Sequence, residues 1–452
     1  MNRVFIRRFE IAGLFGYKNL QLSFDGPAKI IIGENGYGKT TILKALSFLL
    51  KSDYKNLYKI KFDTISIEFD EDHRYSFLHN DIKAYIQYQE NQSEDKDSLF
   101  KYIKNQISHS ELTELLKSIN KETDFYKIIQ RYDSLKHIPS KYIYQVFFEL
   151  VEMTEKFKAF KEMETYINST GYKILYYPTY RRIEADLKNI ISNTEYITRR
   201  RLDIDINSII QDNSIMKFGM GDVEKRKDKI CEEISRSSIS GFAAVSGGMI
   251  SKFLDRKLEG CDEHKFDYNE MSIVLSRIGE NMSKEDKTKI LNQLKDDPFL
   301  SEQSFFLKYF LNQLLSVYKK QEKYDTAIKQ FVRICNKYLT DKEFIYDESL
   351  VSLNLYRKNT DKNDELKLTQ LSSGEKQIIS IFSQLYLEPD KKYIILFDEP
   401  ELSLSIYWQE KLLPDMLESG RCVFLLAVTH SPFIFNNNLK YSTIGIQEFA
   451  YE

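Results

Sequence analysis

A glycine-rich loop between an apolar strand and a helix is the feature that most constrains the fold of this chain. Gly33-Glu-Asn-Gly-Tyr-Gly-Lys39-Thr40 matches the pattern G-x-x-x-x-G-K-[ST], between the apolar run Lys29–Ile32 and a helical pattern over Lys39–Leu50. Glycines let backbone N–H groups turn inward around phosphates, and the start of the helix adds positive potential. The pattern predicts a phosphate-binding loop. The expected nucleotide contacts are Asn35, Gly36, Gly38, Lys39, Thr40 and Thr41, with Thr40 also holding Mg²⁺.

An acidic pair near the other end of the sequence matches the second half of such a site. The apolar run that begins at Tyr393 ends in Asp398-Glu399-Pro400. Ligands bind where the buried strands of α/β sheets end. We therefore expect Asp398 to contact Mg²⁺ and Glu399 to activate the attacking water as a general base.

Two more motifs flank the acidic pair. The loop Leu371-Ser-Ser-Gly-Glu-Lys-Gln377, which we call the signature loop, precedes a helical run. Its Ser372, Ser373 and Gly374 form a hydroxyl-rich helix N-terminus, which suits an anion. His430 follows an apolar strand and lies 32 residues after Asp398. By itself, a single histidine at such a position is more often structural.

Composition excludes several classes of protein. With 42% hydrophobic and 29% charged residues, the 452-residue chain is not wholly disordered. The 65 basic and 67 acidic residues give no overall positive field for nucleic acid, and no apolar run approaches the roughly 20 residues of a membrane span. The four cysteines form no C-x-x-C pair, which favours free thiols in a reducing compartment and a cytoplasmic protein.

Strand patterns at both ends of the chain enclose a long helical region. We predict an α/β head from residues 1–80 and 341–452, a helical segment over 81–180 that returns to a core strand at 172–177, and a helical or coiled-coil insertion over 181–340. The last helix of the insertion carries an apolar stripe, interpreted either as packing within the domain or as a protruding coiled-coil arm. The stripe comprises Leu307, Leu311, Leu314, Tyr318, Gln321, Tyr324, Ile328, Phe331, Cys335 and Tyr338.

Weaker signals leave alternatives open. Phe15 and Tyr17 suit either an adenine contact or core packing. Arg181 and Arg182, at the end of a buried strand, suit either phosphate binding or salt bridges at the boundary of the insertion. Cys261 and His264 resemble half of a zinc site, but without a second pair they are interpreted as unrelated residues. Arg199–Arg201 is interpreted as a solvated face, with nucleic-acid contact as the alternative.

The order of these motifs resembles the SMC/RecF/OLD branch of ABC-type ATPases. The segments GENGYGKTT, YYPTYRRIE, LSSGEKQ, FDEPELSLSIYWQ and VTHSPFIF resemble the ATPases of bacterial anti-phage systems. The resemblance is to the AriA family of the PARIS system, with the PtuA family of Septu and retron-linked systems as the alternative. It implies an α/β fold: an ABC-type P-loop head with a split, mixed sheet, an antiparallel lobe and a large helical or coiled-coil insertion. Ser373 and Glu375 depart from the usual LSGGQ signature, and Tyr37 is bulkier than usual.

The resemblance also implies cofactors and partners. ATP and Mg²⁺ would bind at the motifs above, and His430 would contact the γ-phosphate as the switch histidine. The signature loop would complete the ATP site of an opposite copy. The chain would form a head-to-head homodimer and a higher homo-oligomer such as a hexamer. It would hold a separate Toprim-type nuclease of the AriB kind and release it when a phage-encoded trigger protein is sensed. No membrane partner is implied, and direct nucleic-acid binding stays open.

Other functions predict different sequence features. A RecF- or Rad50-like DNA-repair ATPase is the main alternative, and it predicts a basic groove or a long coiled coil with a C-x-x-C hook. An ABC transporter subunit would place its signature far closer to the P-loop than the 333 residues between Lys39 and Ser372. The 22 residues after His430 predict one more strand and no nuclease domain.

Overall fold

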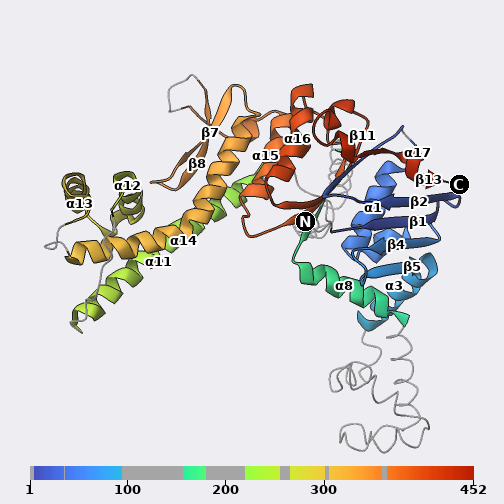
Figure 1. The fold of residues 1–452 in the computed structure, drawn as a ribbon, viewed down its shortest axis with the longest axis horizontal. Coiled ribbons are helices and arrows are strands. Elements are labelled where there is room, and N and C mark those ends of the chain that lie inside the picture. Colours follow the sequence, from blue (N-terminus) through green and yellow to red (C-terminus); the bar gives the residue numbers. More distant parts are fainter. Residues whose placement is uncertain are drawn as a thin grey trace, which may run out of the picture. The chain divides into compact units, whose positions relative to one another are not determined.

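The chain divides into two compact units in a computed structural model (Figure 1). The structure describes residues 5–34, 36–93, 156–179, 219–254, 265–300, 305–358 and 364–451. The first unit comprises Met1–Ile174 and Ser442–Glu452, and the second comprises Leu175–Tyr441. In the described part of the chain, no helix is both long and apolar enough to cross a bilayer.

An antiparallel sheet with strand order β13-β2-β1-β4-β5 forms much of the first unit. Its strands are β1 (Arg8–Leu14), β2 (Lys18–Ser23), β4 (Thr64–Glu68), β5 (Arg74–Leu78) and β13 (Ala450–Tyr451). Apolar and polar residues alternate along β1, so Phe9 and Ile11 are buried on one face. β4 and β5 form a hairpin, in which the two strands pair antiparallel with Ser66 opposite Ser76.

The phosphate-binding loop also lies in the first unit, between β3 (Ala28–Ile32) and α1 (Lys39–Leu50).

The end of the chain differs from the single strand that we expected. It forms β12 (Thr443–Gly445), the short helix α17 (Ile446–Phe449) and β13. β12 pairs parallel with β3, and β13 extends the antiparallel sheet beside β2. Each strand is only two or three residues long, too short to give a clear alternating pattern in the sequence.

Three helices of the first unit pack through aromatic side chains. They are α2 (Tyr54–Tyr58), α3 (His79–Ser93) and α8 (Lys158–Thr170), followed by the strand β6 (Lys173–Tyr177). Tyr54, Tyr85 and Phe160 come from these three helices, and their ring centroids lie 4.4 to 5.2 Å apart. Contacts of this kind between aromatic rings add to the free energy gained by burying them.

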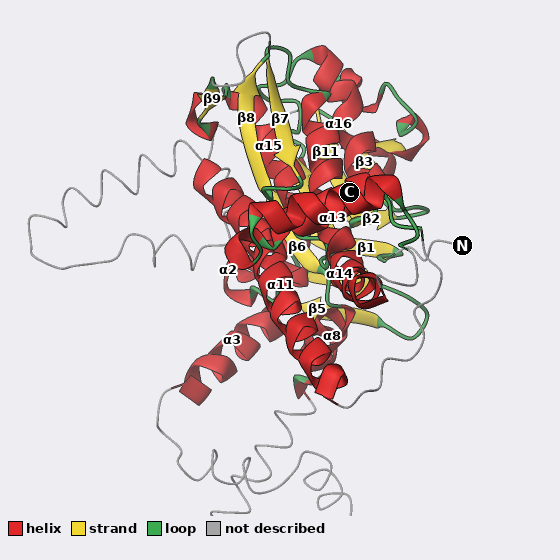
Figure 2. Cartoon of the chain, turned by 90° about the vertical axis from the view of Figure 1, so that its left-hand side faces the viewer, coloured by secondary structure: helices red, strands yellow, loops and turns green. Residues whose placement is uncertain are grey.

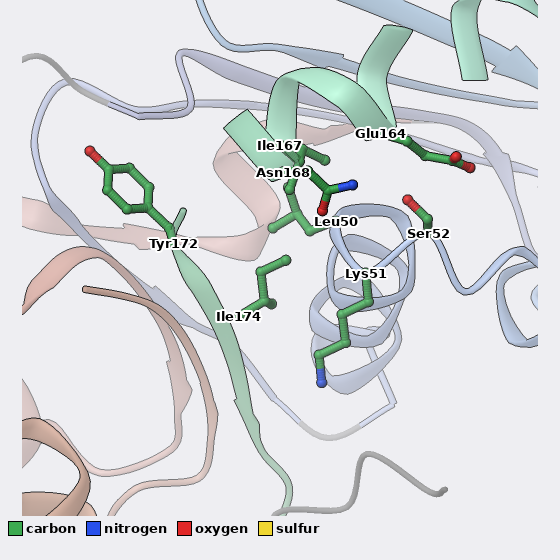
Figure 3. A pocket seen from close by; sticks show the side chains of 8 residues that line it. All are labelled: Leu50, Lys51, Ser52, Glu164, Ile167, Asn168, Tyr172 and Ile174. Atoms are coloured by element: carbon green, nitrogen blue, oxygen red, sulfur yellow. The ribbon is translucent and has the colours of Figure 1, made fainter. Parts of the chain in front are cut away.

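A cavity of about 300 Å³ lies at the C-terminal end of α1 (Figure 3). Burial raises the pKa of Glu164 above its ordinary value, although the Tyr85 hydroxyl donates a hydrogen bond to it at 3.2 Å. Burial also lowers the pKa of Lys51. The surroundings therefore disfavour the charged form of both side chains. The cavity is lined by Leu50, Lys51, Ser52, Glu164, Ile167, Asn168, Tyr172 and Ile174.

The second unit contains the long helices. α11 (Met220–Leu254) and α14 (Phe305–Asn336) run side by side, and α12 (Tyr268–Arg277) and α13 (Lys284–Asp296) join them in a shared apolar core (Figure 1). Seven members of the predicted stripe are at most 3% exposed, as expected from packing within the domain rather than from a protruding arm. They are Leu311, Leu314, Gln321, Ile328, Phe331, Cys335 and Tyr338.

A buried ion pair joins the helices of this unit to a small sheet. Arg277 on α12 contacts Asp325 on α14 at 2.6 Å, and both side chains are at most 3% exposed. Tyr346 donates a hydrogen bond to the same carboxylate from β7. A buried pair has to be well hydrogen-bonded, because removing either partner would leave an uncompensated charge. This cluster therefore fixes the positions of α12, α14 and β7 relative to one another.

The remaining strands of the second unit form two groups. β7 (Lys342–Asp347), β8 (Ser352–Arg357) and β9 (Glu365–Leu366) make an antiparallel sheet (Figure 2). β10 (Tyr393–Asp398) and β11 (Cys422–Thr429) pair parallel, and α15 (Ser373–Tyr386) and α16 (Ile406–Glu418) belong to the same unit. Short 3-10 turns occupy Gly279–Asn281, Leu368–Gln370, Pro432–Phe435 and Lys440–Ser442.

The raised pKa of Glu164 predicts the pH dependence of one substitution. A carboxyl whose pKa is higher in the folded state stabilises the fold at low pH and loses that contribution as pH rises from its unfolded-state pKa to its folded-state pKa. The half-buried carboxyl therefore contributes less to stability at pH 7 than at low pH. We expect Glu164→Gln to raise Tm by a few degrees at pH 7 and to change it little near pH 4, as measured by scanning calorimetry.

Glu162→Gln is the matched control, because Glu162 lies on the same helix and is 54% exposed. Its ion pair with Lys158 is on the surface and is worth little. A Glu164→Gln protein that is less stable than wild type at pH 7 would contradict this assignment of burial.

Candidate functional site

The backbone of the phosphate-binding loop has the conformation that its glycines predict. Gly36 and Gly38 adopt positive φ angles of 86° and 90°. A Cβ atom on Gly38 would lie 2.9 Å from the ring of Phe15, so the loop requires glycine at this position for both conformation and space. Phe15 therefore lies against the loop, and at 39% exposed it is not a core residue.

Lys39 and the first turn of α1 suit a bound anion. Lys39 is 6% exposed, and its amine donates to the carbonyl oxygens of Gly33 and Glu34 within the loop. Gly38 supplies no side-chain cap to α1, and the first turn contains no acidic residue. By contrast, Asp267 caps α12 and Ser283 caps α13 through their side chains. The N-terminus of α1 thus keeps its positive potential for a phosphate group.

The neighbours of Lys39 support the same interpretation. Thr40 and Thr41 are half-buried in the first turn of α1, and Gly36 is exposed. The buried amine and the N–H groups at the helix N-terminus can donate hydrogen bonds to phosphates. The neighbouring hydroxyl can provide an oxygen ligand for Mg²⁺. The residues present therefore fit a nucleotide with its metal ion.

Tyr37, the bulky residue of this loop, is held by three contacts from its own unit. Lys18 lies 4.8 Å from its ring centroid and donates to its backbone carbonyl at 3.3 Å. Gln447 donates to its hydroxyl at 3.4 Å.

Tyr17 is 58% exposed, so the core-packing alternative for this residue is wrong. The adenine contact suggested for Phe15 and Tyr17 stays a prediction.

The acidic pair lies at the end of a strand that is buried throughout. All six residues of β10 are buried, and Asp398 is 1% exposed. Glu399 is half-buried and has a φ of 52°, and its N–H donates to the carbonyl of Val428 at 2.9 Å. A positive φ in a non-glycine residue costs free energy and often marks a functional site. Here it turns the chain sharply between the two carboxylates.

Glu401, which no sequence motif singled out, organises the segment that carries His430. One carboxylate oxygen accepts hydrogen bonds from the N–H groups of His430 (2.9 Å) and Ser431 (3.2 Å). The other accepts the hydroxyl proton of Thr429 at 2.8 Å. Three donors on one carboxylate fix this segment to the loop after the acidic pair. The His430 side chain is exposed, so the contacts to Glu401 set its position through the backbone.

The signature loop forms the capped N-terminus of α15. The Ser372 hydroxyl accepts from the N–H of Glu375, and the Glu375 carboxylate accepts from the N–H of Ser372 at 2.6 Å, a reciprocal capping box. Lys342 on β7 contacts the same carboxylate at 3.0 Å. Burial alone lowers the pKa of Lys342, but its hydrogen bond to Glu375 and the charge of that residue raise it above the ordinary value.

Gly374 brings the signature loop against the loop that follows the acidic pair. A Cβ atom on Gly374 would lie 2.4 Å from the carbonyl oxygen of Ser403 and 3.2 Å from the ring of Trp408. Only glycine fits so close an approach to backbone. Ser372 and Ser373 beside it are exposed, whereas Gly374 is buried against Ser403 and Trp408.

The predicted site residues fall into two groups, one in each unit. Gly36, Gly38, Lys39, Thr40 and Thr41 lie together in the first unit. The second unit holds the other group: Ser372, Ser373, Gly374, Asp398, Glu399 and His430. Asn35 lies outside the described residues, as do Arg181, Arg182, Arg199–Arg201, Cys261 and His264. Within the described ranges no cluster of three or more His, Cys, Asp or Glu residues could hold a metal ion by itself.

Thr179 is a second residue that the sequence analysis did not single out. Its hydroxyl donates to Oδ2 of Asp398 at 3.1 Å. In the segment around it, the sequence indicated only Arg181 and Arg182 as candidate functional residues. Nothing in the sequence pairs two residues 219 positions apart. The one available signal was the position of Thr179 directly after an apolar strand and Pro178, where a sheet edge is expected.

Comparisons with known proteins add a family and several partial likenesses. Residues 5–435 match the family model described as an AAA ATPase domain. The chain is 38% identical over 65 residues to the DNA replication and repair protein RecF of Rickettsia akari (strain Hartford) and 32% identical over 92 residues to the Septu protein PtuA of Bacillus thuringiensis. These matches cover 14% and 20% of this chain, and they span only 18% and 23% of the lengths of the two relatives.

Solved structures give likenesses of low score. The Smc head domain with an extended coiled coil from Pyrococcus furiosus, bound to the C-terminal domain of ScpA, has a TM-score of 0.35 at 15% identity. The Smc head domain with a coiled coil and joint from Pyrococcus yayanosii has a TM-score of 0.32 at 14% identity. The alignments cover 98% of this chain and 93% and 94% of the two others.

Proposed function

Because this chain belongs to the AAA ATPase domain family, we propose that it binds ATP with Mg²⁺ and hydrolyses it to ADP and phosphate. The part of the predicted fold class that is confirmed is an α/β ATPase domain with helical segments. The ABC-type arrangement of the head belongs to the proposal. The observation that carries the proposal is the buried Lys39 in a glycine loop before a helix that has no side-chain cap.

Each motif takes one role in this proposal. Lys39 and the N–H groups at the start of α1 bind the phosphates. Thr40 and Asp398 would hold Mg²⁺, which would supply positive charge beside the phosphates. Glu399 accepts a proton from the attacking water, and His430 contacts the γ-phosphate. Ser372, Ser373 and Gly374 belong to the site of a second copy, so two chains meet head to head.

We further propose a role in anti-phage defence. The similarity to a Septu protein and the resemblance of several motifs to those of PARIS ATPases of the AriA family support it. In this role the chain is a cytoplasmic sensor and scaffold. It assembles into a homodimer and a higher homo-oligomer such as a hexamer, holds a Toprim-type nuclease of the AriB kind, and releases that nuclease when a phage-encoded trigger protein binds.

A DNA-repair ATPase of RecF type is the second candidate, because the chain is 38% identical to a RecF protein over 65 residues. The defence role predicts that the tagged chain, expressed from its own operon, co-purifies with a nuclease encoded beside it, and that the isolated chain cleaves no nucleic acid. The repair role predicts no such partner and an ATPase rate that rises with double-stranded DNA. Native mass measurement and ATPase assays with and without DNA separate the two roles.

Two substitutions separate nucleotide binding from hydrolysis. Glu399→Gln should keep ATP binding and reduce turnover by a factor of about 100 or more, because the general base is lost. Lys39→Ala should weaken ATP binding itself, because the cation facing the phosphates is gone. Binding of a fluorescent ATP analogue and phosphate release measure the two effects.

Lys44→Ala is a suitable control, because Lys44 lies on α1 but outside the motif and is half-buried. It should bind and hydrolyse ATP like the wild type. Normal turnover in purified Glu399→Gln protein would show that another residue activates the water.

A mixture of two inactive variants tests the shared site. Ser373→Arg places a charge on the exposed signature loop and should block head-to-head closure, while ATP binding to a single head survives. A heterodimer of Ser373→Arg and Lys39→Ala chains contains one intact composite site. If dimers exchange at random, the mixture should regain about a quarter of the wild-type activity. Heterodimers that form but stay inactive would contradict completion of the site by the partner.

A further inference from the structure

A threonine hydroxyl contacts the most deeply buried carboxylate of the proposed ATP site. Oγ1 of Thr179 donates a hydrogen bond to Oδ2 of Asp398 at 3.1 Å. Asp398 is 1% exposed, whereas Thr179 is half-buried. Burying a charged carboxylate costs free energy unless hydrogen bonds compensate it. A single hydrogen bond to Asp398 therefore has a large effect on the free energy of the buried carboxylate.

Packing of neighbouring side chains holds the donor in place. The rings of Tyr177 and Phe397, the residues that precede Pro178 and Asp398, lie with centroids 4.9 Å apart at an interplanar angle of 34°. Both side chains are at most 1% exposed. Pro178 has no N–H and ends the strand, so Thr179 follows in a segment with a restricted backbone. The hydroxyl therefore reaches Asp398 from a fixed support.

We infer that Thr179 is a positioning residue for the metal-binding carboxylate of Asp398. A carboxylate can rotate about its χ2 angle, and that torsion has only broad preferences. The hydrogen bond at Oδ2 restricts this rotation and fixes the plane of the carboxylate that would hold the metal ion. Partners that orient the ligands of a metal ion typically change its affinity by 10- to 100-fold when they are removed. The inference rests on the proposed role of Asp398 in holding Mg²⁺.

A purely structural role for Thr179 makes a different prediction. If the hydroxyl only satisfied a buried group, its loss would lower the free energy of unfolding and leave the metal affinity of the folded protein unchanged. If it orients the carboxylate, metal affinity falls in protein that is fully folded. Metal binding is therefore the quantity to measure, together with stability.

The experiment compares Thr179→Val with Thr179→Ser in the full chain. Valine keeps the branched shape and removes the hydroxyl, whereas serine keeps the hydroxyl. Mn²⁺ serves as the probe, and its affinity in the presence of saturating ATPγS is measured by electron paramagnetic resonance. We expect Thr179→Val to weaken Mn²⁺ binding about tenfold, as loss of a hydrogen bond to a charged group implies. Thr179→Ser should stay within about twofold of wild type, and ATPγS affinity in EDTA should be unchanged in both.

Several outcomes would overturn the inference. Wild-type Mn²⁺ affinity in folded Thr179→Val would do so, as would an equal loss in both variants. If Thr179→Val is not recovered folded, Thr179→Ala against Thr179→Ser provides the same comparison. A wild-type protein that fails to bind ATPγS would instead refute the proposed function. The two failures are therefore distinguishable.

Discussion

The fold of the second unit buries the carboxylate of Asp398 at the end of an apolar strand, and the segment that follows it positions several other parts of the unit. Asp398 ends β10, where every residue is buried, and such a charge would destabilise the protein if nothing compensated it. The chain turns sharply at Glu399, and two residues later Glu401 accepts three hydrogen bonds from the segment around His430. Further along, the carbonyl of Ser403 lies so close to the signature loop that only glycine fits at position 374. One short segment therefore sets the positions of the histidine and of the signature loop.

The signature helix connects this segment to the long helices. α15 packs against both α11 and α14, and Arg226 on α11 donates to the Ser383 hydroxyl of α15 at 3.1 Å. At its N-terminus, Glu375 joins α15 to Lys342 on β7, the strand that also contributes to the buried Arg277 cluster through Tyr346. A displacement of the signature loop therefore reaches α11, α14 and β7 through direct contacts. Packed interfaces of this kind move between discrete arrangements rather than deform continuously.

Local patterns in the sequence were enough to predict several elements, and long-range contacts were not. The helix Lys39–Leu50 and the apolar strand before Asp398 were predictable because a glycine loop, an apolar run and a period of three to four residues are each local signals. The hydrogen bond from Thr179 to Asp398 joins residues 219 positions apart, and neither residue type at its position demands the other. The contacts of Glu401 were equally unpredictable. In the sequence it is one more acidic residue in an acidic turn, and only the fold shows that it contacts the segment around His430. The short strands at the end of the chain were missed because two or three residues have no measurable periodicity.

The unusual signature loop is explained by what Glu375 does in the fold. A glutamine at this position could close the capping box with Ser372 through its side-chain oxygen, but it could not form an ion pair with Lys342. Glu375 does both, and at 8% side-chain exposure its charge is compensated by the lysine. The Ser372 oxygen accepts the N–H of Glu375, but its hydroxyl proton can still be donated outward. The departure from the usual signature sequence thus strengthens the cap of α15 and keeps a hydrogen-bond donor on an exposed residue.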